Sequence, residues 1–302
     1  MKKLTSIIIA LVMVLSCMFV FASCGDKTPA GVKVIDIKLT EEEYAFAVQK
    51  GDAELLAQLN DFMAEIEANG KFDEIIAKYF QGGTPTAVKS ADTMKTDGSQ
   101  LIVATNAAFE PFEYMIGENY YGVDMEIMAL FAEKIGKELY IYNMEFDAVC
   151  LSVSAAGGTY TDASGNEVVQ EGGVCDIAAS GLTVSDVRKE FLDFSTAYYQ
   201  ASQMLIVPAD CTDFDNCKTV SDVEAVLKTL GKDTKVGVQK GTTGQLYCEG
   251  NADWGFDGFA FDTISYNTGA LAVQDIINGN CNYVIIDEGP AKAIAENVNA
   301  AN

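Results

Sequence analysis

The sequence predicts an α/β protein whose sheets are mainly parallel. From Leu101 onward, short apolar strands alternate with helices, beginning with LIVAT at 101–105 and a helix at 122–136. Strands and helices that alternate in this way build parallel sheets covered by helices. The chain of 302 residues is long enough for two lobes, each with its own core. Its hydrophobic share of 49% and charged share of 21% are ordinary for a folded globular protein.

The chain begins with an export signal. Two lysines precede a long apolar run that ends in the sequence FASC. This ending resembles the lipobox of bacterial lipoproteins, which makes residues 1–23 the signal peptide and Cys24 the lipid-bearing first residue. Cys17, in VLSC, is a weaker candidate because more apolar sequence follows it. An ordinary signal peptide or a membrane-spanning helix is the alternative. Two acyl chains on Cys24 would suffice for stable anchoring.

The next segment, 24–43, is predicted to be a tether followed by a strand at 32–37, where apolar and polar residues alternate. A pair of helices follows at 51–80. Asp52 can cap the first helix, and an Asn-Gly pair ends it. Its apolar residues recur at helical spacing: Leu55, Leu59, Phe62 and Ile66. Residues 81–100 are polar and rich in Gly, Pro, Ser and Thr, which is typical of a linker.

The remaining elements follow in order along the chain. Further strands are predicted at 139–144, 175–181, 198–207, 235–239, 259–264 and 283–287. Further helices are predicted at 219–231, after the KGTTG turn at 240–244, at 268–279 and at 289–300. Residues 155–174 interrupt this rhythm, and their Ser-Gly-Asn turn indicates a hairpin that decorates the surface. We expect no calcium loop there, because the required glycine is missing.

The charge balance narrows the range of functions. The chain has a net charge of −24 and no histidine. Such a surface repels nucleic acid and anionic lipid headgroups, and the simplest interpretation of the acidity is solubility. The absence of histidine removes His-dependent triads, His-ligated metals and His general bases. We expect no metal, no cofactor and no nucleic-acid partner.

The first candidate binding element is the segment SGLTVSDVRKE. A strand runs into Ser180 and Gly181, Thr183 follows, and a helix begins near Ser185 with Arg188 one turn into it. Backbone N–H groups at such a turn favour an anion. The hydroxyl of Thr183 and the guanidinium of Arg188 could complete a carboxylate site. The alternative is that Arg188 is a solvated ion-pair partner, which is commoner for an arginine on an acidic protein.

Three further elements carry candidate residues. A strand delivers Thr242 and Thr243 to a helix N-terminus, which favours an anion unless these residues form a plain N-cap. Asp287 stands at the C-terminal end of an apolar strand, where open α/β sheets bind ligands; alternatively it caps the next helix. Phe109 and Phe146 follow strands and belong either to a pocket or to the core.

Four segments together resemble the polar amino-acid-binding proteins of bacterial ABC importers: LIVATNAAFEPFEYMIGENYYGVDMEIMALFAEKIG, DIAASGLTVSDVRKEFLDFSTAYY, VGVQKGTTGQ and ALAVQDIINGNCNYVIIDEG. The resemblance covers nearly the whole mature chain. It implies the type II periplasmic-binding-protein fold, in which two α/β lobes joined by two hinge strands close on a ligand. It further implies a monomer that binds an amino acid and an ABC transporter permease, performs no catalysis, and lies outside the cytoplasm with a lipid anchor as its membrane contact.

The resemblance also assigns roles to the candidate residues. The ligand α-carboxylate is implied to bind Arg188, Thr183, Gly181, Thr243 and Thr242, and the α-amine is implied to bind Asp287. The ligand side chain is implied to contact Phe109, Phe146, Asn106 and Ser180. Many family members have aspartate at the position of Asn106. A basic ligand is therefore less expected here than a glutamine-like or small neutral one.

The order of the segments departs from the family. Its members end with an extended segment and two helices, and here that ending stands first, at 41–80. The resemblance therefore implies a circular permutation, which surface termini make tolerable. The alternatives are that 32–83 is a leftover fragment or is exchanged with a second molecule.

The permutation predicts which residues form each lobe. Lobe 1 is expected at 44–207, with the linker 81–100 and the insertion 155–174, and lobe 2 at 208–302, completed by a strand within 24–43. The chain is expected to cross between the lobes near residues 44–48 and 199–207.

Two other functions stay open. A dehydratase-like enzyme on the same fold would need an acid or base near the ligand, and the candidates are Glu110, Glu113 and Glu288. A surface-tethered sensor would bind the ligand without a transporter.

The six cysteines beyond the signal region permit three disulfides in an exported chain, or stay reduced in an anaerobic source.

Overall fold

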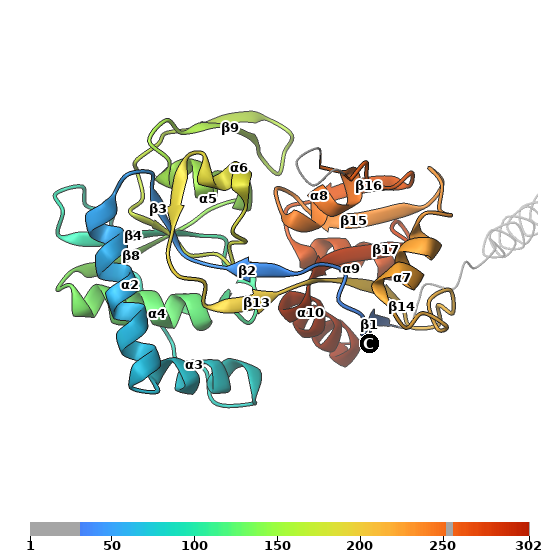
Figure 1. Cartoon of the computed structure of the whole chain (residues 1–302), viewed down its shortest axis with the longest axis horizontal. Coiled ribbons are helices and arrows are strands. Elements are labelled where there is room, and N and C mark those ends of the chain that lie inside the picture. Colours follow the sequence, from blue (N-terminus) through green and yellow to red (C-terminus); the bar gives the residue numbers. More distant parts are fainter. Residues whose placement is uncertain (1–30, 252–255, 302) are drawn as a thin grey trace, which may run out of the picture.

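The computed structural model describes residues 31–251 and 256–301, which form two lobes that are each built on a five-stranded sheet (Figure 1). The sheet of lobe 1 contains, in order, β12 (Leu192–Phe194), β3 (Ala47–Gln49), β11 (Ile177–Ala178), β4 (Gln100–Thr105) and β8 (Glu138–Asn143). The sheet of lobe 2 contains β1 (Val32–Ile35), β14 (Gln203–Pro208), β17 (Tyr283–Asp287), β15 (Lys235–Gln239) and β16 (Asp262–Tyr266). Strand β4 pairs parallel with β8 and β11, and β15 pairs parallel with β16 and β17. These pairings confirm the predicted α/β class. The sheets are mixed rather than mainly parallel, because β3 pairs antiparallel with β11 and β12, and β14 pairs antiparallel with β1 and β17.

Helices and two small sheets complete the lobes. The helices of lobe 1 are α2 (Ala53–Ala68), α3 (Lys71–Phe80), α4 (Val123–Lys134), α5 (Phe146–Val153) and α6 (Asp186–Lys189). Those of lobe 2 are α7 (Val220–Leu227), α8 (Thr243–Glu249), α9 (Gly269–Ile277) and α10 (Glu288–Ala301). Lobe 1 also carries the antiparallel strands β5 (Ala108–Phe109), β6 (Glu113–Ile116) and β7 (Asn119–Tyr121), and the hairpin β9 (Gly158–Thr161) and β10 (Glu167–Gln170).

Two short strands join the lobes. They are β2 (Glu42–Tyr44) and β13 (Tyr199–Ala201), which pair antiparallel with Tyr44 opposite Tyr199. The chain leaves lobe 1 earlier than the expected boundary at residue 207, because β14 pairs with β1 and β17 in lobe 2. Ser202 separates β13 from β14, so the strand predicted at 198–207 is two strands that serve different sheets.

The helical pair at the front of the chain forms part of the core of lobe 1. Asp52 caps α2, because its carboxylate accepts from the backbone N–H of Leu55 at 3.1 Å. Of the predicted apolar face, Leu59, Phe62 and Ile66 are buried, together with Met63, and Leu55 is partly buried. The ring of Phe62 lies 5.3 Å from that of Phe131 on α4, and Ile75 of α3 is fully buried. The helices predicted from spacing therefore bury their apolar stripe against the lobe that begins at β4.

The first described strand lies beside the last helix. β1 is an edge strand of lobe 2 and pairs antiparallel with β14. The side chain of Asn299 on α10 accepts from the backbone N–H of Val32 at 2.9 Å and donates to the backbone oxygen of Val32 at 2.9 Å. The beginning and the end of the described chain are thus in direct contact.

The insertion at 155–174 forms the predicted hairpin but does more than decorate the surface. Lys240, which follows β15 in lobe 2, donates to the backbone oxygen of Thr161 in β9 at 2.5 Å. The same ammonium pairs with Asp147 of α5 at 2.7 Å. The hairpin and α5 therefore both contact lobe 2.

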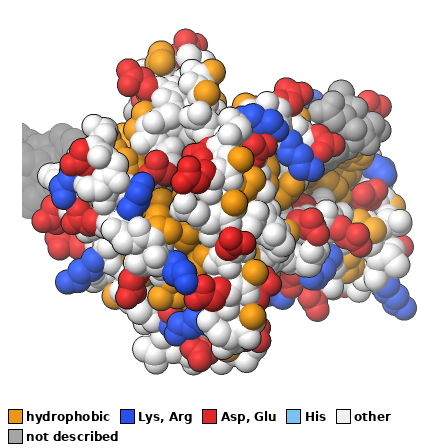
Figure 2. All heavy atoms as spheres, turned by 60° about the vertical axis from the view of Figure 1, so that its left-hand side comes forward, with side chains coloured by type: hydrophobic (Ala, Val, Ile, Leu, Met, Phe, Trp, Pro, Cys, Tyr) orange, Lys and Arg blue, Asp and Glu red, His pale blue; other side chains and the backbone are white. Residues whose placement is uncertain are grey.

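The expected signal peptide and Cys24 lie outside the described residues. Within 31–251 and 256–301, no helix is both long and apolar enough to span a bilayer. The six cysteines of these segments are free thiols, so none of the disulfides that the sequence permits is formed. On the face shown in Figure 2, acidic and basic side chains are interspersed.

Replacing Phe62 by alanine is expected to lower the free energy of unfolding by about 3–5 kcal/mol, because a buried ring is lost from the interface of α2 and α4. Chemical denaturation measures this change. Gln58→Ala, on the exposed face of the same helix, is the matched control and should change the free energy by less than about 0.5 kcal/mol. Equal stabilities of the wild type and Phe62→Ala would mean that the helical pair is dispensable.

Candidate functional site

A small cavity lies between the lobes and is lined by eight of the ten residues predicted to contact a ligand: Phe109, Phe146, Gly181, Thr183, Arg188, Thr242, Thr243 and Asp287. Its volume of about 10 Å³ is close to what one water molecule needs. An adjoining hollow of about 240 Å³ shares Phe146, Arg188, Thr242 and Thr243 with it. The lobes are therefore closed on each other, and the inner cavity is too small for an amino acid in this arrangement.

Arg188 bridges the lobes at this cavity. It lies on the short helix α6, where the hydroxyl of Ser185 accepts from its backbone N–H at 3.3 Å. Its guanidinium donates to the backbone oxygen of Thr183 at 2.7 Å and to that of Gly241, in lobe 2, at 3.2 Å. The guanidinium carbon lies 5.6 Å from the centre of the Phe146 ring. No carboxylate in the described part of the chain pairs with Arg188, so its donors can be exchanged for those of an incoming anion.

The turn before α6 fits tightly against Phe109. Gly181 has a φ of 49°, and a Cβ at this position would lie 2.7 Å from the Phe109 ring, so glycine is required there. The N–H of Gly181 donates to the carboxylate of Asp124 at 3.0 Å. This N–H therefore points into lobe 1, away from the cavity in which it was predicted to bind a carboxylate.

The two predicted side-chain residues outside the cavity lining are held by lobe 1. The hydroxyl of Ser180 donates to Glu113 at 3.1 Å and accepts from the backbone N–H of Asn106 at 3.0 Å. The amide of Asn106 donates to the backbone oxygen of Met144 at 2.7 Å and accepts from Gln239, at the end of β15, at 3.1 Å. Asn106 thus contacts both lobes, and these two hydrogen bonds use one of its two N–H donors and one lone pair of its oxygen.

The threonines at the cavity have different partners. Thr242 is the N-cap of α8, because its hydroxyl accepts from the backbone N–H of Gln245. The hydroxyls of Thr183 and Thr243 donate to the same oxygen of Glu42, at 2.8 and 2.7 Å. Glu42 lies on β2 and is 8% exposed. The sequence analysis did not identify Glu42 as a site residue. The signal was the run of three consecutive glutamates, because side chains alternate along a strand and only one or two of the three can face inward.

Asp287 is a buried carboxyl at the end of β17, with 3% of its surface exposed. Its carboxylate accepts from the hydroxyl of Tyr44, on β2, at 2.5 Å. Burial and the nearby charge of Glu42 together raise the pKa of Asp287 to about 7, although hydrogen bonds from Tyr44 and Gln203 oppose the increase. Among residues 31–251 and 256–301, no lysine or arginine forms an ion pair with this carboxyl.

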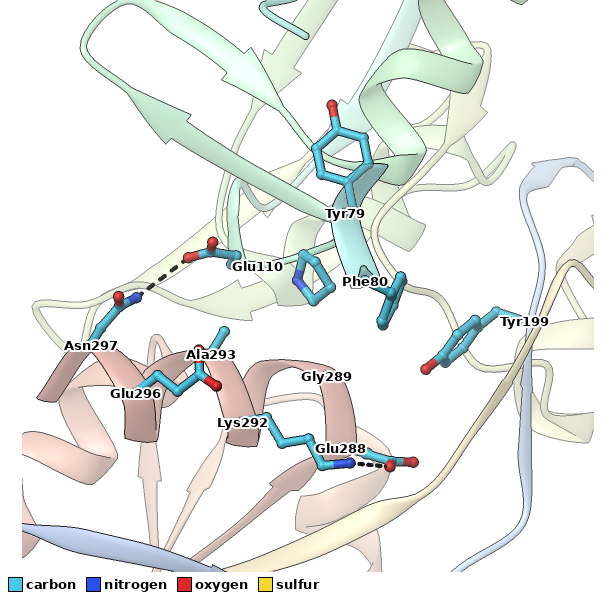
Figure 3. Close-up of a pocket in the computed structure, with 11 residues that line it drawn as sticks. Tyr79, Phe80, Glu110, Tyr199, Glu288, Gly289, Lys292, Ala293, Glu296 and Asn297 are labelled. Atoms are coloured by element: carbon cyan, nitrogen blue, oxygen red, sulfur yellow. Dashed lines mark hydrogen bonds and ion pairs between the residues drawn. The ribbon is translucent and has the colours of Figure 1, made fainter. Parts of the chain in front are cut away.

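A second cavity, of about 280 Å³, lies between α3 and α10 (Figure 3). Phe80 and Tyr199 line one side of it, and Lys292 and Glu288 line the other. Lys292 is paired with Glu288 at 2.6 Å. Because its lining cation is already neutralised, this cavity suits an amino-acid carboxylate less well than the cleft with Arg188.

The candidate catalytic acids lie away from the cleft. Glu110 and Glu288 line the second cavity. Glu113 is fully buried in lobe 1, where burial and the charge of Asp124 raise its pKa well above the usual range. In the part of the chain that the structure describes, no group of three or more Cys, Asp or Glu side chains is arranged to hold a metal ion.

Comparison with protein-family models gives no match. In sequence, the chain is similar to the arginine-binding extracellular protein ArtP of Bacillus subtilis (strain 168), with 28% identity over 158 residues. This match covers 52% of the chain and 51% of ArtP, so the chain spans about half the length of this curated relative.

Two solved structures are similar in fold. The arginine-bound form of ArgBP from T. maritima is 26% identical with a TM-score of 0.50, and the match covers 66% of this chain and 78% of that chain. The ancestral amino acid-binding protein AncCDT-1, a precursor of cyclohexadienyl dehydratase, is 25% identical with a TM-score of 0.51, over 66% and 74% of the two chains. The chain is therefore related to amino-acid-binding proteins and has their two-lobed type II periplasmic-binding-protein fold.

Proposed function

We propose that the protein captures an amino acid between its two lobes and delivers it to an ABC importer. The observation that carries this proposal is that Arg188 from lobe 1 and Asp287 from lobe 2 line the same cavity. An amino acid is a zwitterion, and this pair offers one opposite charge to its carboxylate and one to its ammonium. The similarity to arginine-binding proteins supports the same class of ligand.

The hydrogen bonds of the closed cleft suggest how a ligand would be held. The guanidinium of Arg188 would exchange backbone oxygens for the ligand carboxylate, which is a stronger, charge-assisted partner. The ammonium would lie beside Asp287 and hold it ionised. Each charge-assisted hydrogen bond contributes roughly 1.5–3 kcal/mol. Two or three of these, with contacts to the rings of Phe109 and Phe146, approach the ~8 kcal/mol of micromolar affinity.

The proposed setting is outside the cytoplasm. The matched protein of Bacillus subtilis is named as extracellular, and the sequence FASC supports removal of residues 1–23 and lipidation of Cys24. A monomer tethered by this lipid would present the closed lobes to a permease. A sensor would use the same cleft without a permease. The similarity to AncCDT-1 leaves a dehydratase as a second candidate function. The candidate catalytic acids Glu110, Glu113 and Glu288, however, do not line the cleft.

We further propose that the chain is a circular permutant of the usual order. The contact between Asn299 and Val32 supports this proposal, because a short connection between residues near the two described ends would restore that order. The helices α2 and α3, which would normally come last, pack in the core of lobe 1. The linker 81–100 would then join the former end to the former beginning.

Arg188→Ala is expected to weaken amino-acid binding by roughly 10- to 100-fold or more, since a charge-assisted pair is lost. A thermal-shift screen over the common amino acids selects the ligand, and calorimetry measures the affinity. Lys189→Ala is the matched control, because it removes an exposed cation of the same helix that pairs with Asp186. Unchanged affinity of Arg188→Ala would contradict the assignment of the carboxylate site.

Amino-acid binding is expected to strengthen as the pH rises from about 5 to 8. The raised pKa of Asp287 means that the unliganded fold favours the protonated carboxyl, and this stabilisation is lost as the pH rises from about 4 to 7. A ligand ammonium favours the ionised form instead, so binding near pH 6 should release a proton. Calorimetry in two buffers of different ionisation enthalpy detects this release, and Asp287→Asn should abolish it. A pH-independent affinity would argue against an ammonium at Asp287.

A re-permuted chain that begins within 81–100, with residue 302 joined to residue 31 by a short linker, is expected to keep its thermal stability and ligand affinity. The reason is that the joined ends already lie in contact. A chain with the same joint but opened within α2, between residues 60 and 61, is the control and should unfold lobe 1. Loss of folding in the first variant would refute the permutation.

A further inference from the structure

The cavity between α3 and α10 has walls from both lobes (Figure 3). Phe80 ends α3 and Glu110 follows β5 in lobe 1, Tyr199 lies on the joining strand β13, and α10 belongs to lobe 2. The volume of about 280 Å³ is near the lower end of the range of about 300–1,000 Å³ for small-molecule pockets. In Figure 1, α3 and α10 lie below the joining strands, whereas α6 and α8 lie above them. The cavity is therefore on the opposite side of these strands from the cleft with Arg188.

Helix α10 presents one face to this cavity. Glu288, Lys292 and Glu296 are spaced four residues apart, so their side chains lie along one side of the helix. Glu288 has two cationic partners, because Lys292 lies 2.6 Å and Lys38 lies 3.0 Å from its carboxylate oxygens. Glu296 is exposed and, in the part of the chain that the structure describes, pairs with no lysine or arginine. One of the two carboxylates on this face is therefore neutralised, and the other is not.

Glu110 brings a second carboxylate without a cation to the cavity. It accepts from the amide of Asn297 at 3.4 Å, close to the limit for a hydrogen bond, and no lysine or arginine of the described ranges pairs with it. Asn297 is the neighbour of Glu296, so Glu110 of lobe 1 and Glu296 of lobe 2 line the same end of the cavity (Figure 3). Two like charges repel each other, and a cation between them would offset this repulsion.

Aromatic rings form a wall beside these carboxylates. Phe80 stacks on Tyr199, with ring centres 5.3 Å apart and an angle of 20° between the ring planes. Phe80 is nevertheless 36% exposed, and Pro111 adds further apolar surface to the same cavity. An aromatic ring attracts a cation, and it also buries the carbon atoms of an organic molecule. The cavity thus combines an anionic end with an apolar wall.

This combination suits an organic cation better than a metal ion. Among the described residues, no group of three or more Cys, Asp or Glu side chains is arranged to hold a metal. An amine with an apolar body, in contrast, has one part for each part of the cavity. Its ammonium has three N–H donors and can serve two carboxylates at once.

We propose that this cavity binds a small primary amine with an apolar body, with the ammonium between Glu110 and Glu296 and the body against Phe80 and Tyr199. A free amino acid is a poorer occupant, because the lysine that lines the cavity is already paired with Glu288. The proposal does not depend on the proposed function, since Glu110 and Glu296 do not line the cleft with Arg188.

Calorimetry of the protein with 2-phenylethylamine tests the proposal, and saturable binding of one molecule is expected. 2-Phenylethanol has the same body without the charge, and methylamine has the charge without the body. Each is expected to bind roughly tenfold more weakly or worse, because a charge-assisted hydrogen bond or the buried apolar surface is lost.

Variants locate the binding in the cavity. Glu110→Gln and Glu296→Gln are each expected to weaken the binding of 2-phenylethylamine roughly three- to tenfold, since one ion pair of a partly exposed site is lost. Phe80→Leu keeps an apolar side chain but removes the ring, and should weaken binding roughly threefold. Glu67→Gln makes the same charge change at an exposed position of α2 outside the cavity, and it is the matched control that should bind like the wild type.

Two other origins of binding give different results. If the net negative charge attracted amines non-specifically, binding would not saturate, and Glu67→Gln would weaken it as much as Glu110→Gln. If the amine bound beside Asp287 in the cleft, Asp287→Asn would weaken it and Glu110→Gln would not. Either pattern would overturn the proposal, and so would a wild type that binds no 2-phenylethylamine.

The two proposals can fail separately. Glu110→Gln is expected to bind amino acids as tightly as the wild type does, because Glu110 lies outside the cleft. A wild type that bound no common amino acid would refute the proposed function, and the amine titrations would still decide the role of this cavity.

Discussion

Strand β2 determines how the two halves of the site face each other. Its backbone holds the turn of lobe 1, where the N–H of Val184 donates to the oxygen of Glu43 at 2.9 Å. Its side chains reach lobe 2, where Tyr44 donates to Asp287 at 2.5 Å and Glu42 accepts from Thr243 at 2.7 Å. One short strand therefore contacts both halves of the site. A displacement of β2 would change the position of Arg188 relative to Asp287, so closing of the cleft involves the strand as well as the two lobes.

Carboxyl groups outnumber the guanidinium near the cleft. Asp287 lines the cavity with Arg188, Glu42 accepts from two threonines of the lining, and Asp124 is buried behind Gly181 in lobe 1. Burial is the largest cause that raises the pKa of Asp124 and of Asp287, each to about 7. Gly181 gives its N–H to Asp124, and this donor is lost to an anion in the cavity. Recognition of a ligand carboxylate then depends on Arg188, while a ligand ammonium offsets the negative charge near Asp287.

Sequence patterns predicted the elements whose positions depend on local structure. The helical spacing of Leu59 and Phe62 was sufficient for α2, because the buried face repeats along the chain. The eight residues that line the inner cavity could be predicted to lie together, because the sequence places them near strand ends and helix starts; their contacts with a ligand stay predictions. The break at Ser202 could not be predicted, because β13 and β14 are both extended and their partner strands determine which sheet each joins. The role of Glu42 could not be predicted either, since three adjacent glutamates are equivalent until the pairing of β2 is known.

The contacts that close the lobes also constrain how a ligand enters. Lys240 of lobe 2 binds Thr161 and Asp147 of lobe 1, and Glu42 accepts from both lobes, so contacts between protein groups stabilise this closed arrangement. A ligand shifts an equilibrium only by the difference of its affinities for the two states. Yet the cavity holds about 10 Å³, so an amino acid cannot enter while Arg188 bonds to Gly241 across the lobes. Capture must begin with the breaking of that bond, and the bond can reform to the ligand carboxylate when the lobes close again.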